Sequence, residues 1–180
     1  MINQYFKIFF ILIFGWFLVM FQQGFINDLP GWASEANLVI VILIFILGLK
    51  GIKEALAWAL WLGVLLDIFS FYFFGLYIIS LSLTVVFSHF LLERFFTNRS
   101  LYSFLALDLF TSLFFRLFIL CFIYLISLFG VLNFVLSDNW WLRQGQGIVI
   151  DLILTAIIFY SLSLISRSFK PVFLLRGKRK

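Results

Sequence analysis

Four charged side chains lie within long apolar stretches of this sequence: Asp67, Asp108, Arg116 and Asp151. A charge inside a bilayer is costly unless it is paired or hydrated, so each of the four needs a partner or a role. Their types allow a structural ion-pair cluster, a substrate or ion site between helices, or an aspartyl catalytic pair such as Asp67 with Asp151. The companion motifs of aspartyl membrane peptidases are absent from the sequence. We favour the structural cluster, which would hold the third, fifth and sixth apolar stretches in register.

The sequence lacks the residues that a metal site, a disulfide or a common hydrolytic or phosphoryl-transfer site requires. His89 is the single histidine, and one His without a Cys, a second His or paired carboxylates nearby cannot build a usual zinc or di-iron site. We expect it to lie at the membrane interface. Cys121 is expected to be a small buried hydrophobe, and a single Cys allows no internal disulfide. The sequence has no Walker A loop, Gly-x-Ser-x-Gly or His-Glu-x-x-His motif. We therefore expect no enzymatic activity, no cofactor and no metal ion.

The composition places the chain in a membrane. Of 180 residues, 64% are apolar and only 12% are charged, against the roughly 25% charged residues of a soluble domain. Phe alone occurs 27 times. A water-soluble fold of this size has too little interior to bury that much apolar surface. These proportions exclude a soluble enzyme, a free nucleic-acid binder and a disulfide-stapled secreted domain.

The apolar stretches predict an all-α polytopic membrane protein with about six transmembrane helices. A helix needs about 20 mostly apolar residues to cross the hydrocarbon core. The predicted spans form a single membrane domain and lie at about 5–21, 37–49, 55–69, 76–92, 101–129 and 148–166, with a basic tail at 167–180. The second and third are short and are separated only by Lys50 to Glu54, which predicts a tight helical hairpin. A five-span alternative, with one of this pair re-entrant, stays open.

The positions of Lys and Arg predict the orientation. With six spans, eleven of the thirteen Lys and Arg residues fall on one side of the membrane. The other side receives only Arg143, and Arg116 lies within a span. Basic residues are retained on the cytoplasmic side, so both termini are predicted to be cytoplasmic. The net charge of +5 is then mostly a marker of one membrane face and gives no reason to expect nucleic acid as a partner.

Depth in the membrane selects the partner of Arg116. Counted from the cytoplasmic start of each span, Asp67 lies about 18 Å deep, Arg116 about 22 Å and Asp108 about 10 Å. Asp151 lies about one turn below the outer end of its span. Arg116 is therefore predicted to pair with Asp151 or Asp67 rather than with Asp108. Ser112 is four residues from both Asp108 and Arg116, which places these three side chains near one helix face.

Small and polar residues recur at spacings of four in three of the spans. The series are Gly63 and Asp67; Ser80, Thr84 and Ser88; and Gly147, Asp151 and Thr155. Such stripes allow helices to approach closely and to form hydrogen bonds with one another. They predict that Asp67 and Asp151 face protein rather than lipid.

One short motif stands out from the apolar background. The stretch contains Gly63, Asp67 and Ser70 at spacings of four and three residues, followed by Gly75-Leu-Tyr77. It resembles the G-x-x-x-D-x-x-S…G-L-Y/H pattern of the rod-shape-determining MreD family. The six spans, the cytoplasmic termini, the tight second hairpin and the basic tail are similar to that family as well.

The resemblance implies a non-enzymatic scaffold subunit of the bacterial cell-elongation machinery, in the cytoplasmic membrane. The implied partners are the bitopic MreC protein, the actin-like MreB filament, and the peptidoglycan synthase RodA with its transpeptidase, together with membrane lipid. MreD proteins are also similar in fold to the substrate-binding S-components of energy-coupling-factor transporters, which is the alternative function. S-components usually carry an Ala-x-x-x-Ala stripe on the first helix. The run from Phe6 to Phe21 contains no Ala, which counts against that role.

Overall fold

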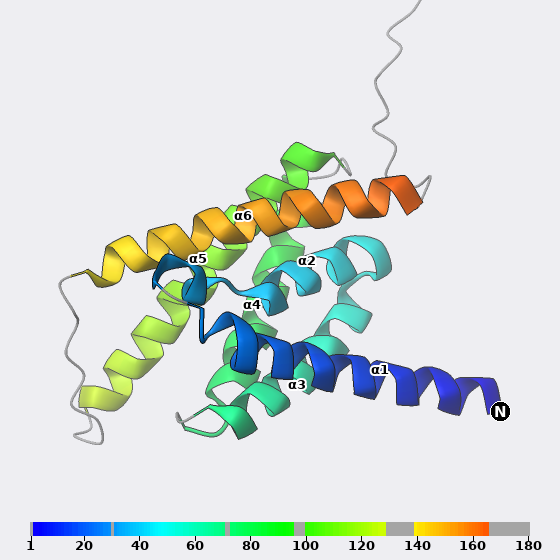
Figure 1. The fold of residues 1–180 in the computed structure, drawn as a ribbon, viewed down its shortest axis with the longest axis horizontal. Helices are drawn as coiled ribbons and strands as arrows, with labels where there is room; N and C mark the ends of the chain where they lie inside the picture. Colours follow the sequence, from blue (N-terminus) through cyan, green and yellow to red (C-terminus); the bar gives the residue numbers. More distant parts are fainter. Residues whose placement is uncertain (1, 30, 71–72, 96–99, 129–138, 166–180) are drawn as a thin grey trace, which may run out of the picture.

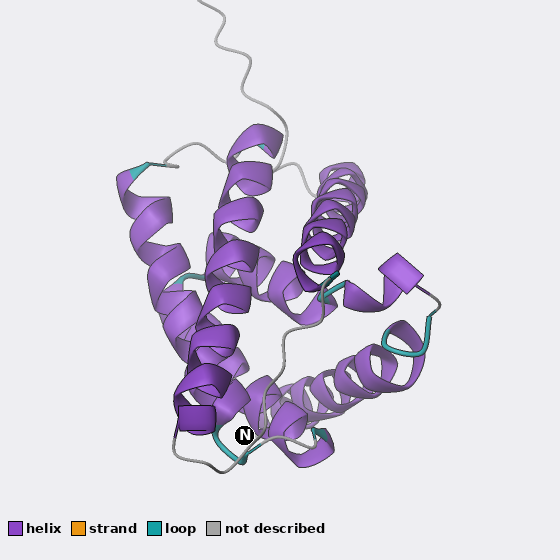
Figure 2. Ribbon diagram, turned by 90° about the vertical axis from the view of Figure 1, so that its left-hand side faces the viewer, coloured by secondary structure: helices purple, strands orange, loops and turns teal. Residues whose placement is uncertain are grey.

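The computed structural model describes residues 2–29, 31–70, 73–95, 100–128 and 139–165. All of the regular secondary structure in these residues is helical (Figure 2). The elements are α1 (Ile2–Phe21), a π-helical turn η1 (Gln22–Ile26), a 3-10 turn η2 (Gly31–Glu35), α2 (Leu38–Lys50), α3 (Ile52–Phe69), α4 (Leu76–Arg94), α5 (Leu101–Leu128) and α6 (Trp140–Ile165). The predicted all-α class is confirmed. The predicted tail at 167–180 and the ends of the fifth and sixth predicted spans, residues 129 and 166, lie outside the described residues.

Successive long helices run in alternating directions, as Figure 1 shows. The beginning of α1, the turn between α2 and α3, and the end of α6 lie at one end of the molecule, on the right of the figure. The end of α1 and the beginnings of α2 and α6 lie at the opposite end. The helices α1, α2 and α6 thus run between the same two ends of the molecule, whereas α4 crosses them steeply (Figure 1).

Among the described residues, four helical segments are long and apolar enough to cross a membrane: Ala33–Lys50, Leu76–Arg94, Leu101–Leu128 and Trp140–Leu164. They correspond to the second, fourth, fifth and sixth predicted spans. A shorter apolar run, Ile11–Ile26, extends from α1 through η1, and α3 has 18 residues that include Lys53, Glu54 and Asp67. The prediction of a helical membrane protein with several crossings is thus confirmed.

The hairpin between α2 and α3 is tighter than the predicted Lys50–Glu54 connection. Only Gly51 separates the two helices, and its φ of +90° lies in a region that favours glycine. Its N–H donates to the carbonyl of Leu47 at 3.0 Å, which closes the last turn of α2. The absence of a Cβ at residue 51 therefore allows the chain to reverse within one residue.

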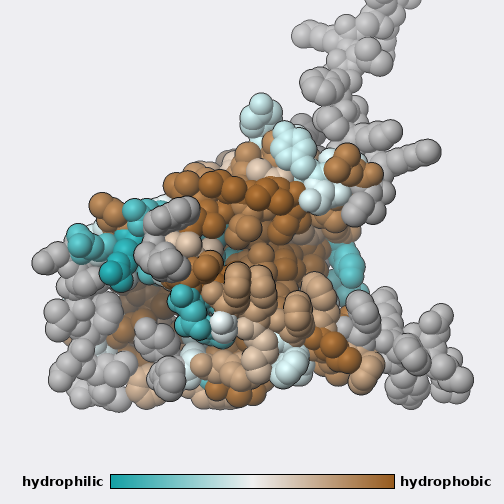
Figure 3. Space-filling model, viewed as in Figure 1, coloured by the Kyte–Doolittle hydropathy of each residue, from teal (hydrophilic) through white to brown (hydrophobic). Residues whose placement is uncertain are grey.

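The helix α2 forms the centre of the fold. Eight of its thirteen residues are buried, because α3, α4, α5 and α6 all pack against it. Its sequence is apolar on every face, as expected for a helix with no solvated side. Around it, large apolar side chains remain exposed on α1, α4, α5 and α6. The resulting surface is mainly hydrophobic, with hydrophilic residues gathered where α1 ends and α6 begins (Figure 3). An exposed apolar belt of this extent fits a lipid environment.

The helix α6 begins earlier than predicted. The sequence places the sixth span at about 148–166, whereas α6 starts at Trp140. The added turns hold the polar run Arg143-Gln-Gly-Gln-Gly147, which hydropathy assigns to a loop. Gln144 in this run forms hydrogen bonds with side chains of two other elements, so polar contacts support the helix where apolar burial does not.

Candidate functional site

Arg116 on α5 forms an ion pair with Asp151 on α6. The Nη2 atom of Arg116 lies 2.9 Å from Oδ2 of Asp151, which is fully buried. The same nitrogen donates to the main-chain carbonyl of Glu35 at 2.8 Å, and Nη1 donates to Oε1 of Gln144 at 2.6 Å. Arg116 was predicted to pair with Asp151 or Asp67 rather than with Asp108, and the pairing with Asp151 is confirmed. The guanidinium therefore joins α5, α6 and η2.

Asp151 connects the same helices to the beginning of α2. Its Oδ1 accepts a hydrogen bond of 2.6 Å from the main-chain N–H of Asn37, the N-cap residue of α2. Its Oδ2 also lies 3.3 Å from the hydroxyl of Ser112. A buried carboxylate is tolerated when its oxygens are this well supplied with donors. Asp151 is thus the central acceptor of the cluster.

Asp108 contacts the cluster through Ser112. It is fully buried, and its Oδ1 is 3.5 Å from the hydroxyl of Ser112, at the outer limit of a hydrogen bond. Ser112 stands between Asp108 and Asp151, which agrees with the predicted common face of Asp108, Ser112 and Arg116 on α5. Asp108 therefore joins Arg116 only through intervening groups.

Asp67 does not belong to this cluster, which corrects the prediction that it shares one polar site with Asp108, Arg116 and Asp151. Its carboxylate accepts three main-chain N–H groups around the beginning of α4: from Gly75 at 3.0 Å, from Tyr77 at 2.9 Å and from Ile78 at 3.2 Å. A helix leaves its first N–H groups unpaired and carries a partial positive charge there, so a carboxylate is an effective cap. Asp67 therefore holds α3 to α4, and the polar cluster joins α5, α6 and the segment before α2.

The other residues of the short motif gather at the same α3–α4 joint. A Cβ on Gly63 would lie 2.7 Å from the Cα of Ile78, so glycine allows the two helices to touch there. Gly75 has a φ of +101° and precedes the first residue of α4. The Ser70 hydroxyl donates to the carbonyl of Asp67 at 3.3 Å. The motif residues Gly63, Asp67, Ser70, Gly75 and Tyr77 thus form one structural unit.

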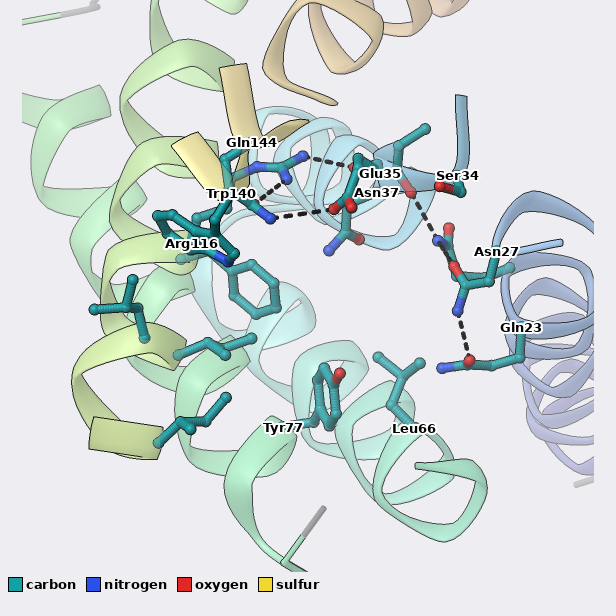
Figure 4. A pocket seen from close by; sticks show the side chains of 16 residues that line it. Gln23, Asn27, Ser34, Glu35, Asn37, Leu66, Tyr77, Arg116, Trp140 and Gln144 are labelled. Atoms are coloured by element: carbon teal, nitrogen blue, oxygen red, sulfur yellow. Dashed lines mark hydrogen bonds between the residues drawn. The ribbon is translucent and has the colours of Figure 1, made fainter. Parts of the chain in front are cut away.

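A pocket of about 270 Å³ lies beside the ion pair (Figure 4). Residues of η1, η2, the α2 N-cap and the beginning of α6 supply a polar wall that includes Gln23, Glu35, Asn37 and Gln144. The apolar lining consists of Leu66 from α3 with Phe115, Ile119, Leu120 and Ile123 from α5. The rings of Tyr77 and Trp140 also line the space. The pocket therefore offers both hydrogen bonds and apolar contact.

Amide side chains that the sequence did not predict as site residues also belong to this site. Gln22 is buried, donates to the carbonyl of Ala36 at 2.8 Å and accepts from the N–H of Leu38 at 3.0 Å. It thereby fixes η1 against the beginning of α2. The signal available in the sequence was a group of uncharged amides at the outer ends of predicted spans: Gln22, Gln23, Asn37 and Gln144.

The two remaining candidates lie elsewhere. His89 lies 3.2 Å from Glu93 one turn further along α4, and within the described residues no group of three His, Cys, Asp or Glu side chains could hold a metal ion. Cys121 is exposed on α5, so the expectation that it is buried is wrong. The apolar residues around Cys121 reflect the lipid-facing surface and not an interior position.

The fold and its buried polar joints define a multi-pass helical membrane protein with a polar pocket at one end. Comparison of the chain with models of known protein families, with curated proteins and with solved structures finds no match.

Proposed function

We propose that this chain is a non-enzymatic scaffold subunit of the bacterial cell-elongation machinery, similar to MreD, in the cytoplasmic membrane. The observation that carries the proposal is the α3–α4 joint. The residues of the MreD-like motif lie together there, and the Asp67 carboxylate caps α4 through three main-chain hydrogen bonds. A motif with a structural role suits a subunit that presents a fixed helical surface to other membrane proteins.

The proposed topology has six spans with both termini in the cytoplasm. It is supported by the alternating directions of successive long helices (Figure 1) and by the eleven-to-one distribution of basic residues outside the spans. In this topology α1 and α3 cross the membrane as well. The three charges of α3, Lys53, Glu54 and Asp67, fit a crossing helix because the first two are near its cytoplasmic end and Asp67 is buried against α4.

The proposed partners are an MreC-like bitopic protein, an MreB-like filament, and RodA with its transpeptidase. The test is co-purification of the full-length chain with the MreC-like protein of the same genome from gently solubilised membranes. We expect recovery of the partner with the parent chain and with Asp28→Ala, a matched variant of an exposed Asp. Asp67→Ala should reduce the recovery. Loss of the partner from the parent sample would contradict the proposal.

A substrate-binding subunit similar to an S-component is the second candidate, and the pocket favours it. Such a subunit would retain a small molecule in stoichiometric amount and would bind a transmembrane coupling subunit instead of a bitopic protein. Mass spectrometry of the purified chain under native conditions separates the two functions. A bound small molecule together with failure to recover the MreC-like partner would select the transport function.

A further inference from the structure

The formal charges of the pocket disfavour an anion. Arg116 lines the pocket, but its charge is balanced by Asp151 at 2.9 Å. Glu35 also lines the pocket and forms no ion pair within the described part of the chain. Arg143 is exposed and is not among the lining residues. The local sum of charges is therefore negative, and a carboxylate, phosphate or sulfate ligand would meet an unbalanced carboxylate.

The free hydrogen-bonding groups of the pocket include both donors and an acceptor. Gln144 donates to Oε2 of Glu35 at 3.2 Å, which leaves its second N–H and Oε1 of Glu35 without a bond among the described residues. The amide oxygen of Gln23 accepts from Asn27 at 2.7 Å, and that of Asn37 accepts from Ile40 at 3.2 Å. The amide nitrogens of Gln23 and Asn37 make no bond within the same residues. A hydroxyl group can satisfy such a mixed set, because it donates and accepts at once.

The apolar residues of the pocket indicate a second, apolar part of the ligand. Ile119, Leu120 and Ile123 of α5 line the pocket together with the polar residues of η1 and η2. Trp140 and Tyr77 line the same space. A ligand that fills the pocket must therefore carry a hydroxyl-rich part and an adjoining apolar part. At about 270 Å³ the space lies just below the range of pockets for drug-sized molecules, roughly 300–1,000 Å³.

We propose that this pocket binds an uncharged, hydroxyl-rich head group joined to an apolar chain, with the hydroxyls between Glu35 and the amides of Gln23, Asn37 and Gln144, and with the chain along Ile119, Leu120 and Ile123. This site does not depend on whether the protein is a scaffold or a transport subunit. It gives the protein a capacity to bind an amphiphile, in addition to any protein partner.

The test uses the full-length chain in phosphatidylcholine nanodiscs and three probes. Octyl glucoside has the proposed head group and chain, octyl sulfate has the same chain with an anionic head, and glucose is the head group alone. We expect saturable binding of octyl glucoside, at least about tenfold weaker binding of octyl sulfate, and weaker binding of glucose. Equal binding of the two octyl compounds would show partitioning and overturn the proposal. Glucose binding as tight as that of octyl glucoside would overturn its apolar half.

Two matched pairs of variants test whether octyl glucoside binds in the pocket. Leu120→Trp fills the pocket, whereas Leu117→Trp changes a lipid-exposed leucine of the same helix. Gln144→Leu removes a polar pocket group, whereas Gln146→Leu changes a glutamine that does not line the pocket. We expect about tenfold weaker octyl glucoside binding for the first member of each pair and no change for the second. Thermal melting of each variant checks folding. If both pairs bind alike while all four variants melt like the parent, the proposal is wrong.

Discussion

Gly147 on α6 leaves the space that the guanidinium of Arg116 occupies. A Cβ at residue 147 would lie 2.6 Å from Nη2 of Arg116 and 2.6 Å from the main-chain oxygen of Glu35. Gly147 is one turn before Asp151, so the residue that makes room for the cation and the residue that pairs with it lie on one face of α6. The stripe of Gly147, Asp151 and Thr155 therefore positions an ion pair.

Gly147→Ala should destabilise the protein, because the added methyl group meets a main-chain atom that cannot easily move. Overpacking of this kind costs about 1–3 kcal/mol. The matched control is Gly145→Ala, two residues earlier, where a Cβ would meet nothing within 4 Å. Thermal melting in detergent should show a lower midpoint for Gly147→Ala and an unchanged or higher one for Gly145→Ala, since Ala favours a helix over Gly. Equal midpoints would contradict the packing described above.

Arg116→Leu should destabilise the fold more strongly, because it leaves Asp151 buried without its cation. Loss of one partner of a buried pair costs about 3–5 kcal/mol. The control is Arg143→Leu, an exposed arginine at the beginning of the same helix as Asp151. The yield of folded protein in detergent and its melting temperature measure the effect. The ion pair has no structural importance if Arg116→Leu purifies and melts like Arg143→Leu.

Replacing both charges should recover part of that loss. The double variant Arg116→Leu with Asp151→Leu removes the unpaired carboxylate, and apolar replacement of a whole buried pair is often tolerated. Recovery should be incomplete, because Asp151 also accepts from the main-chain N–H of Asn37 and from Ser112. If the double variant melts at a lower temperature than Arg116→Leu alone, Arg116 is not the main partner of the Asp151 carboxylate.

Asp67→Asn should loosen the beginning of α4 while the ion pair of α5 and α6 stays in place. The asparagine keeps one acceptor oxygen and loses the charge that interacts with the helix terminus, at a cost of about 1–3 kcal/mol. Hydrogen exchange of the Tyr77 and Ile78 amides should become faster. Ser70→Ala serves as the control, because its hydroxyl reaches only the main-chain oxygen of Asp67 at 3.3 Å. Unchanged exchange at these amides would refute the capping role.

Cysteine accessibility tests the six-span topology. In a background with Cys121→Ser, a Lys53→Cys variant should be labelled only when a membrane-impermeant thiol reagent reaches the cytoplasmic face. An Arg143→Cys variant should be labelled from the outside, because α6 then runs from the outer face inward. Labelling of both residues from the same side would remove the proposed orientation.

The sequence predicted those features of the structure that depend on neighbouring residues in the chain. Hydropathy predicted α4 and α5 closely because each is long and mainly apolar. It missed the first turns of α6 because Gln144 is stabilised by contacts with Arg116 and Glu35. The rise per residue placed Arg116 and Asp151 at one depth, and their ion pair confirms that reasoning. The same estimate of depth allowed Asp67 as a partner of Arg116. The actual partners of Asp67 are main-chain N–H groups, which a comparison of side-chain types does not reveal.

The sequence by itself determined that this is a helical membrane protein, because its apolar surface is too large to bury in water. It also determined that a few charged residues must be paired within the membrane, because an unpaired charge there is costly. Only the tertiary structure decided which helices meet. It separated Asp67 from the ion-pair cluster, exposed Cys121, and brought the amides of η1, the α2 N-cap and α6 around one pocket that α5 also lines. The physical reason is that a helix pattern fixes which residues share a face, whereas the neighbour of that face depends on how all the helices pack together.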